Sequence, residues 1–326
     1  MVDIAELERH DEAALRAFYD VEVAAHAAER PYAVLRTFPQ LCHMAEGGSE
    51  YFRRTFLVAS EGGRVVGTAD LGRSLRDNLH LADVEVRVMP EARRRGIGRA
   101  LHDEAVARGR ADGRTTFLGE AYQPAGAESS SATAFARALG YDDVQREDHQ
   151  VLDLPAAAPP RTADGYEILT WANRAPDDLL EAYARMRTQM LRDMPSGEVD
   201  WEPVVLDPER LREEEERVGH AYDHLVAVVR RTSDGELGGY SKVFLPHDLD
   251  FVVQDDTMVM AAHRGLGLGL VLKSAVLGIL AADHPERRIV HTWNAVTNAP
   301  MQRINRVLGF RPVELMLEMQ RKDADA

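Results

Sequence analysis

The chain has 326 residues, more than one hydrophobic core usually contains, so we expect two domains. Its formal net charge of −15 argues against nucleic-acid binding, which requires a basic face. The single cysteine, Cys42, excludes an intrachain disulfide and a cysteine zinc cluster, and no metal site is expected. Because the sequence shows neither a membrane span nor a signal peptide, we expect a cytoplasmic protein.

The first half predicts a helix over 13–25, then a hairpin whose strands, 56–60 and 64–69, flank Gly62 and Gly63. A strand over 84–89 leads into a glycine-containing loop and a helix over 99–106. A strand at 115–118, a helix ending near Gly140 and a last strand over 150–154 follow. The Pro- and Ala-rich segment 155–164 is typical of a linker, so the expected domains are 1–154 and 165–326.

The second half repeats the same order of elements. A helix over 177–191 precedes a hairpin of strands 225–229 and 236–240 and a strand at 257–260. A second glycine loop, a helix over 270–277, a strand at 288–293, a helix ending near Gly309 and a last strand over 313–319 complete it. Corresponding landmarks lie about 170 positions apart, which indicates duplication of one unit of helices and strands.

Each loop has the pattern Arg-x-x-Gly-x-Gly between a strand and a helix. Glycines keep Cβ atoms out of the turn, and the first N–H groups of a helix have no intrahelical acceptor, so an anionic phosphate is the natural partner. A Walker loop is excluded because no Gly-Lys dipeptide occurs, and the glycine spacing does not fit a dinucleotide fingerprint. The alternative is that these are packing or turn glycines.

With these two loops and the Leu-Gly-aromatic helix ends, the chain resembles the GNAT superfamily of acetyltransferases. Its plan is similar to tandem bacterial acetyltransferases of the mycothiol synthase type. The resemblance implies an α+β (mixed αβ) chain with two tandem folds, each a mixed, mostly antiparallel sheet flanked by helices, with splayed central strands. It also implies that acetyl-coenzyme A is the cofactor, its pyrophosphate on the loop amides and its pantetheine arm between the splayed strands.

The residues implied to bind the coenzyme belong to the two loops, the strand ends before them and three asparagines of the second half. They are Val88, Met89, Arg93, Arg94, Arg95, Gly96, Ile97, Gly98 and Arg99 in the first half, and Val259, Met260, Arg264, Gly265, Leu266, Gly267, Leu268, Gly269, Asn294, Asn298 and Asn305 in the second.

Many members of the family have a tyrosine in the last helix that protonates the departing thiolate. Asn305 stands at that place in the second half and Ala136 in the first, so neither half keeps the usual acid. Asn305 is nevertheless expected among the catalytic residues, because its amide can donate a hydrogen bond to the sulfur or to the coenzyme. The second half has the richer polar set, Thr257 with the three asparagines, and it is favoured as the catalytic half. The first half has the more typical Arg-rich loop, and both are expected to bind coenzyme.

An amine must lose a proton before it can attack a thioester, so a base is expected. The equivalent residues Glu85 and Asp256 are the chosen candidates, and Asp83, Asp255 and His247 remain open. We expect N-acetylation of a small-molecule amine, such as an antibiotic or secondary metabolite, by a monomeric pseudo-dimer or a homodimer. The alternatives are a coenzyme-binding module without catalysis, and an acyltransferase that uses longer acyl groups or a protein N-terminus.

Overall fold

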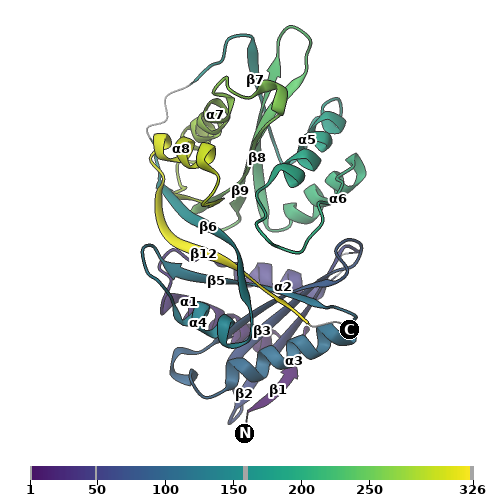
Figure 1. Ribbon diagram of the computed structural model, residues 1–326, viewed down its shortest axis with the longest axis vertical. Coiled ribbons are helices and arrows are strands. Elements are labelled where there is room, and N and C mark those ends of the chain that lie inside the picture. The colour runs from purple at the N-terminus through teal and green to yellow at the C-terminus, as the bar shows by residue number, and fades with distance from the viewer. Residues whose placement is uncertain (1, 48–49, 157–160, 324–326) are drawn as a thin grey trace. The chain divides into compact units, whose positions relative to one another are not determined.

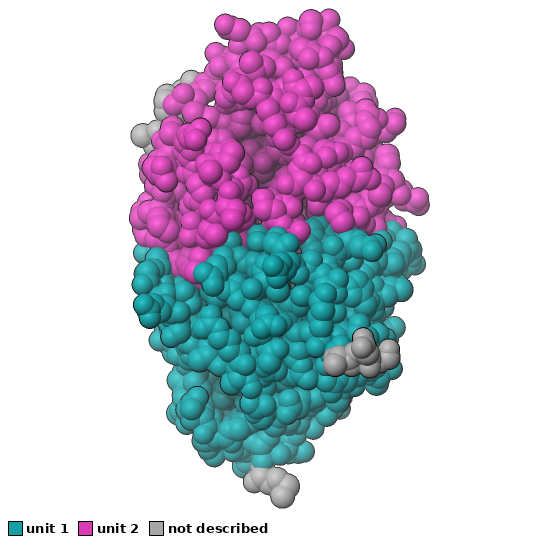
Figure 2. All heavy atoms as spheres, in the orientation of Figure 1, with its two compact units in different colours: residues 1–146, 197–202, 316–326 teal, residues 147–196, 203–315 magenta. Residues whose placement is uncertain are grey.

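The computed structural model describes residues 2–47, 50–156 and 161–323. They form two compact units, coloured separately in Figure 2. Unit 1 comprises Met1–Arg146, Gly197–Glu202 and Met316–Ala326, and unit 2 comprises Glu147–Ser196 and Pro203–Leu315. Residues 157–160 of the expected linker lie outside the described residues.

Unit 1 follows the order predicted for the first half (Figure 1). Its elements are β1 (Asp3–Glu6), α1 (Glu12–Ala27), α2 (Phe38–Glu46), β2 (Phe52–Glu61), β3 (Arg64–Ser74), β4 (Leu81–Val88), α3 (Ile97–Ala111), β5 (Thr116–Pro124), α4 (Ser131–Ala138) and the start of β6 (Asp142–Asp153). The predicted hairpin turn is confirmed, because Gly62 and Gly63 both have positive φ between β2 and β3.

The central strands of unit 1 separate as the resemblance implies. Strand β4 pairs with β5 in parallel only from Leu81 to Asp83, opposite Thr116 to Leu118. Beyond these residues β4 stays paired with β3 alone, as far as Val88 opposite Gly67. Among the described strands, none therefore pairs with the backbone edge of β4 that faces β5 near the loop.

Unit 2 repeats the arrangement. Its elements are β7 (Tyr166–Ala172), α5 (Leu180–Asp193), α6 (Pro208–Gly219), β8 (Tyr222–Arg231), β9 (Leu237–Pro246), β10 (Phe251–Val259), α7 (Leu268–Asp283), β11 (Ile289–Ala295), α8 (Ala299–Leu308) and the start of β12 (Arg311–Lys322). Strands β10 and β11 pair in parallel from Phe251 to Gln254 and then separate. Unlike β4, β10 carries a bulge between Gln254 and Thr257.

Each sheet is completed by a strand from the other half of the sequence. In unit 1 the order is β1-β2-β3-β4-β5-β12, where β12 contributes its C-terminal residues. In unit 2 the order is β6-β11-β10-β9-β8-β7, and β6 pairs with β11 from Glu147 to Asp153. The compact units therefore differ from the expected domains 1–154 and 165–326, because strand pairing exchanges the ends of the two halves.

Helices cover both faces of the sheet in unit 2, with α5 and α6 on one side and α7 and α8 on the other (Figure 1). Alternate residues of β8 enter different cores, so Leu225 and Ala227 pack with α7 while Val226 and Val228 pack with α5. In unit 1, α1 and α2 pack on one face through Phe18, Leu41 and Phe56. The predicted fold class is confirmed. None of the described helices has the length and apolarity needed to cross a membrane.

Candidate functional site

The loop of unit 1 presents backbone amides to open space. Gly96 has φ +84 and precedes α3, and a Cβ built on it would meet nothing within 4 Å. The first backbone N–H of α3 that donates within the turn is that of Ala100, and its acceptor is the Gly96 carbonyl. The N–H groups of Ile97, Gly98 and Arg99 therefore have no intrahelical acceptor and carry the positive end of the helix dipole. This arrangement fits a phosphate group.

Unit 2 contains an equivalent loop with open backbone amides. Gly265 and Gly267 have φ +84 and +74, and space around both is open. Helix α7 begins at Leu268, and Gly269 lies under Ile304, where an added Cβ would approach within 2.9 Å. Both loops therefore have the backbone geometry that the coenzyme's pyrophosphate would need.

The arginines distinguish the two loops. Arg93 and Arg264 are equivalent: each donates its Nε to the last residue of the preceding strand, the carbonyls of Val88 at 3.2 Å and Val259 at 3.0 Å. Each also pairs with an acid at 2.5 Å, Glu29 or Asp193. These hydrogen bonds and ion pairs hold the two loops in place. We therefore assign both arginines a structural role rather than direct contact with phosphate.

The remaining loop cations occur in unit 1. Arg95 pairs with Glu61, and Arg99 donates to the Ala138 carbonyl. Arg94 is exposed, has φ +62, and makes no side-chain hydrogen bond or ion pair within the described ranges. The unit 2 loop has Leu266 and Leu268 around its glycines instead, so unit 1 offers the phosphate a charge that unit 2 lacks.

The strand ends differ from the expectation at two positions. The N–H groups of Met89 and Met260 donate to the carbonyls of Val66 and Gly238, so they point toward β3 and β9. Because backbone groups alternate along a strand, Val86 and Val88 face the opening beside β5, and Thr257 and Val259 face the opening beside β11. The valines remain candidates for the pantetheine arm. The prediction for Met89 and Met260 is wrong, because their amides are already paired.

The asparagines of unit 2 are engaged by the protein itself. Asn298 caps α8 by accepting from the Met301 amide, and Asn294 donates to Thr292 at 3.3 Å. Asn305 is 0% exposed and accepts from the Lys273 ammonium at 2.6 Å. We therefore assign these asparagines structural roles, and the argument for catalysis in unit 2 is weakened accordingly.

A chain of hydrogen bonds continues from Lys273 through unit 2. Asn305 donates to Gln150 at 2.8 Å, Gln150 to Gln302 at 2.5 Å, and Gln302 to Asp148 at 3.0 Å. Each amide accepts from the preceding group and donates to the following one, which fixes their orientations. The place of the missing tyrosine is thus filled by a packed polar network.

Lys273 makes the stability of unit 2 depend on pH. Burial lowers the pKa of this ammonium to about 7, against about 10.4 when it is unfolded. The unfolded chain holds the proton between these values and the folded chain does not, so the free energy of unfolding should rise with pH there, by at most about 1.4 kcal/mol per unit. We expect urea unfolding of Lys273→Met at pH 7, 8 and 9 to show a flatter dependence, with Lys322→Met as the exposed control. Equal slopes in all three proteins would contradict this.

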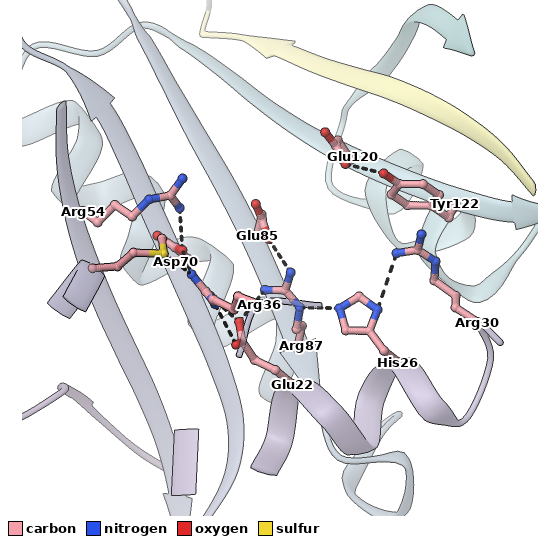
Figure 3. A network of polar contacts seen from close by, with 11 residues as sticks. Glu22, His26, Arg30, Arg36, Arg54, Asp70, Glu85, Arg87, Glu120 and Tyr122 are labelled. Atoms are coloured by element: carbon pink, nitrogen blue, oxygen red, sulfur yellow. Dashed lines mark hydrogen bonds and ion pairs between the residues drawn. The ribbon is translucent and has the colours of Figure 1, made fainter. Parts of the chain in front are cut away.

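The predicted base of unit 1, Glu85, lies in a network of charged side chains (Figure 3). Its carboxylate contacts Arg87, and this ion pair lowers the pKa of Glu85 to about 2. Asp83 lies on the same face of β4 and has no ion pair among the described residues. Loss of hydration raises the pKa of Asp83 to about 6, and Glu85 and Glu120 contribute to the increase. Asp83 therefore suits proton acceptance better than Glu85.

The equivalent acids of unit 2 are packed against cations. Asp256 accepts from the Tyr240 hydroxyl at 2.8 Å and lies 3.5 Å from Arg187. Burial and the Asp256 carboxylate raise the pKa of Asp255, which lies 3.9 Å from Lys242. Arg187, Lys242 and Tyr240 are themselves buried, so this face of unit 2 is a closed cluster of charges. His247 follows β9 at the opposite end of β10 from the loop, away from these groups.

The sequence interpretation missed most of the unit 1 network. It is formed by side chains of α1, the segment after it, and β2 to β5, namely Glu22, His26, Arg30, Arg36, Arg54, Asp70, Arg87, Glu120 and Tyr122 (Figure 3). One signal was present, because Asp83, Glu85 and Arg87 alternate along β4 and thus share a face. The partners on α1 could not be assigned without the helix docked on the sheet.

Comparisons agree with this arrangement. Residues 10–141 match the acetyltransferase (GNAT) family. No curated protein matches the sequence. A tandem GNAT protein from the clavulanic acid biosynthesis pathway, solved without acetyl-coenzyme A, is 28% identical over 100% of both chains, with a TM-score of 0.84. A GCN5-related N-acetyltransferase from Sphaerobacter thermophilus is 17% identical, with 100% of this chain and 98% of that chain covered and a TM-score of 0.73.

Proposed function

Since this chain is a tandem GNAT protein, we propose that it transfers an acetyl group from acetyl-coenzyme A to an amine of a small molecule, and that unit 1 performs the reaction. The observation that carries the proposal is the combination, in unit 1, of open loop amides, an Arg94 side chain without an ion pair and an edge of β4 without a strand partner, as far as the described residues show. The similarity to a protein of the clavulanic acid pathway supports a small-molecule acceptor.

The sequence favoured unit 2, but the structure supplies arguments for unit 1. Asn298 and Asn305 have partners within unit 2, and Asp256 is held by Tyr240 and Arg187. In unit 1, by contrast, Asp83 makes no ion pair within the described ranges, and its side chain reaches the surface although neighbouring groups remove part of its hydration. A group that is to accept a proton from a substrate must be reachable, and Asp83 meets that condition.

Three groups of unit 1 would then act on the reactants. Acetyl-coenzyme A would supply a thioester whose carbonyl carbon an amine can attack. The amides of Ile97, Gly98 and Arg99, with the Arg94 side chain, would hold its phosphates. The N–H groups of Val86 and Val88 face the opening and would donate to a carbonyl oxygen placed there. Asp83 would take the proton that the amine loses as the N–C bond forms.

In unit 1 Ala136 occupies the position of the family's tyrosine, so this position supplies no acid. A thiol with a pKa near 8.5, taking cysteine as the guide, leaves as a thiolate without much assistance. The absence of the acid is therefore compatible with turnover.

Unit 2 has a second candidate function, coenzyme binding without catalysis. It keeps the open amides at Gly265 and Gly267, while the place of the missing tyrosine is occupied by buried Asn305. Longer acyl groups or a protein N-terminus remain alternatives for the donor and acceptor, and comparing acyl chain lengths in the same assay would distinguish the first of these.

The two loop glycines provide a matched test. We expect Gly96→Val to lower coenzyme A affinity at unit 1 and kcat/KM for thiol release at least about tenfold, equivalent to about 1.4 kcal/mol. The reason is that a β-branched residue is strained at positive φ and its side chain would cover the amides. Gly267→Val should change turnover less than about threefold, although calorimetry should show the loss of any second binding site.

The opposite pattern would assign catalysis to unit 2. If neither substitution alters coenzyme binding in a protein whose thermal unfolding is unchanged, the loops do not bind coenzyme and the proposed function fails.

A further inference from the structure

Most charges on the polar face of the unit 1 sheet neutralise one another. Three guanidinium groups pair with three carboxylates of α1, β3 and β4, and the pairs are Arg36 with Glu22, Arg54 with Asp70, and Arg87 with Glu85 (Figure 3). The Glu22 and Asp70 side chains are almost fully buried, so these ion pairs lie beneath the surface that a ligand would contact. Arg87 also donates to His26 at 2.9 Å, which holds its guanidinium in place.

Two carboxylates remain outside this balance. Asp83 and Glu120 make no ion pair within the residues that the structure describes, and Glu120 accepts a hydrogen bond from the Tyr122 hydroxyl at 2.7 Å. Asp83 lies opposite Leu118 in the parallel pairing, and Glu120 is two residues further along β5, so both side chains lie on the same face. They flank the point at which β4 and β5 separate.

Further polar atoms on this face lack partners. The Thr68 hydroxyl and the Asp70 Oδ1 are buried, and neither has a hydrogen-bond partner in the described part of the chain. Thr68 lies opposite Arg87 and Asp70 opposite Glu85 on β3, so both point to the same face as the two carboxylates. Both atoms lie beneath the contact surface, where they add to the excess of acceptors on this face, and such a face is suited to a ligand rich in N–H donors.

The surrounding cations do not favour a substrate carboxylate. Arg30 stacks on the ring of Tyr122, the residue that donates to Glu120, with its guanidinium 3.4 Å from the ring centre (Figure 3). It also contacts His26 at 3.4 Å. Its flat face is thus directed at the ring, although its positive charge counteracts the rise in the pKa of Glu120 that burial causes. Five carboxylates, with Asp83 included, then face four guanidinium groups, so the charge in excess is negative.

We propose that unit 1 selects a short diamine, binding the ammonium that does not react at Glu120 while Asp83 receives the proton from the amine that does. This inference rests on the proposed acetyltransferase function. The two carboxylates supply two negative charges, and a diamine is a dication at neutral pH because each amine has a pKa near 10. A monoamine would satisfy one of these carboxylates, and an amino acid would place its own carboxylate beside Glu120.

Three acceptors of similar length test the selection: propylamine, 1,3-diaminopropane and β-alanine. They differ at the far end, which is a methyl, an ammonium or a carboxylate group. With acetyl-coenzyme A as donor, we expect kcat/KM for 1,3-diaminopropane to exceed that for propylamine at least about tenfold, the effect of one charge-assisted hydrogen bond, and β-alanine to be the poorest. Glu120→Gln should reduce the preference for the diamine to less than about threefold, because kcat/KM for the diamine should fall far more than kcat/KM for propylamine.

The control is Glu104→Gln on α3, an acid that pairs with Arg108 on the helix itself. It should retain the full preference for the diamine. Equal rates for the diamine and propylamine in the native protein, or an equal loss for both in Glu120→Gln, would overturn the proposal.

Failure of the acetyltransferase function can be recognised separately, because no acceptor would then release thiol. In that case calorimetric titration of 1,3-diaminopropane into the native protein and into Glu120→Gln decides the matter. Binding that weakens at least about tenfold in the variant supports the diamine site, and the absence of binding to the native protein excludes it.

Discussion

Replacing Leu317 by Ala should destabilise unit 1, although Leu317 lies in the second half of the sequence. Leu317 is 1% exposed and belongs to the part of β12 that completes the unit 1 sheet beside β5. Removing a buried leucine side chain costs about 2–5 kcal/mol. Hydrogen exchange measured by mass spectrometry should therefore accelerate in β5, while exchange in β8 of unit 2 should change little.

Other contacts of the same segment point to the same outcome. Asp323 donates its amide to the Thr115 carbonyl and accepts two hydrogen bonds from Arg110, at 2.6 and 2.7 Å. Leu317→Met preserves volume and should cost less than about 1.5 kcal/mol, so it is the matched control. Faster exchange in β8 rather than β5 would show that β12 supports unit 2 instead.

This strand exchange is the part of the fold that the sequence could not predict. The sequence predicts both last strands, 150–154 and 313–319; the first overlaps β6, which ends at Asp153, and the second lies within β12. Each is an apolar run that pairs equally well with either of two similar edge strands, because β5 and β11 belong to repeated units. The local sequence pattern therefore predicts that a strand forms but not which strand it pairs with, because that choice depends on how the rest of the chain folds.

The loops could be predicted because their chemistry is local. A strand, two glycines and a helix start occupy about ten consecutive residues, and the backbone geometry near Gly96 and Gly267 follows from them. Charge pairing could not be predicted in the same way. Glu85 and Asp83 are both acids on β4, but the contact with Arg87 lowers the pKa of Glu85, whereas loss of hydration raises the pKa of Asp83.

The asparagines illustrate the same limit. Asn305 aligns with the family's tyrosine, yet its role is set by Lys273, which lies 32 positions away, and by Gln150, which lies 155 positions away. A polar residue at a catalytic position was a reasonable candidate from spacing alone. Once α7 and β6 pack around α8, the same side chain satisfies buried neighbours and has no surface left for substrate.

The largest effect on catalysis is expected from Asp83→Asn. If Asp83 accepts the proton of the acceptor amine, its loss should lower kcat/KM by about 10²–10⁴-fold, the usual contribution of a general base. The native protein should also lose activity below about pH 6, because the raised pKa of Asp83 leaves its carboxyl protonated there. In the variant this acid limb should disappear, since asparagine does not titrate.

The variant Glu85→Gln tests whether the loss of rate is specific to Asp83 or follows the removal of any negative charge on β4. The pKa of Glu85 is about 2, so Glu85 is ionised throughout the range in which the rate changes and cannot produce a limb near pH 6. Glu85→Gln should therefore keep the limb but displace it to lower pH, because Glu85 contributes to the raised pKa of Asp83, and its rate should fall where Arg87 loses its partner. If Glu85→Gln removes the limb and Asp83→Asn keeps it, the base is Glu85, and the ion pair with Arg87 must open during turnover.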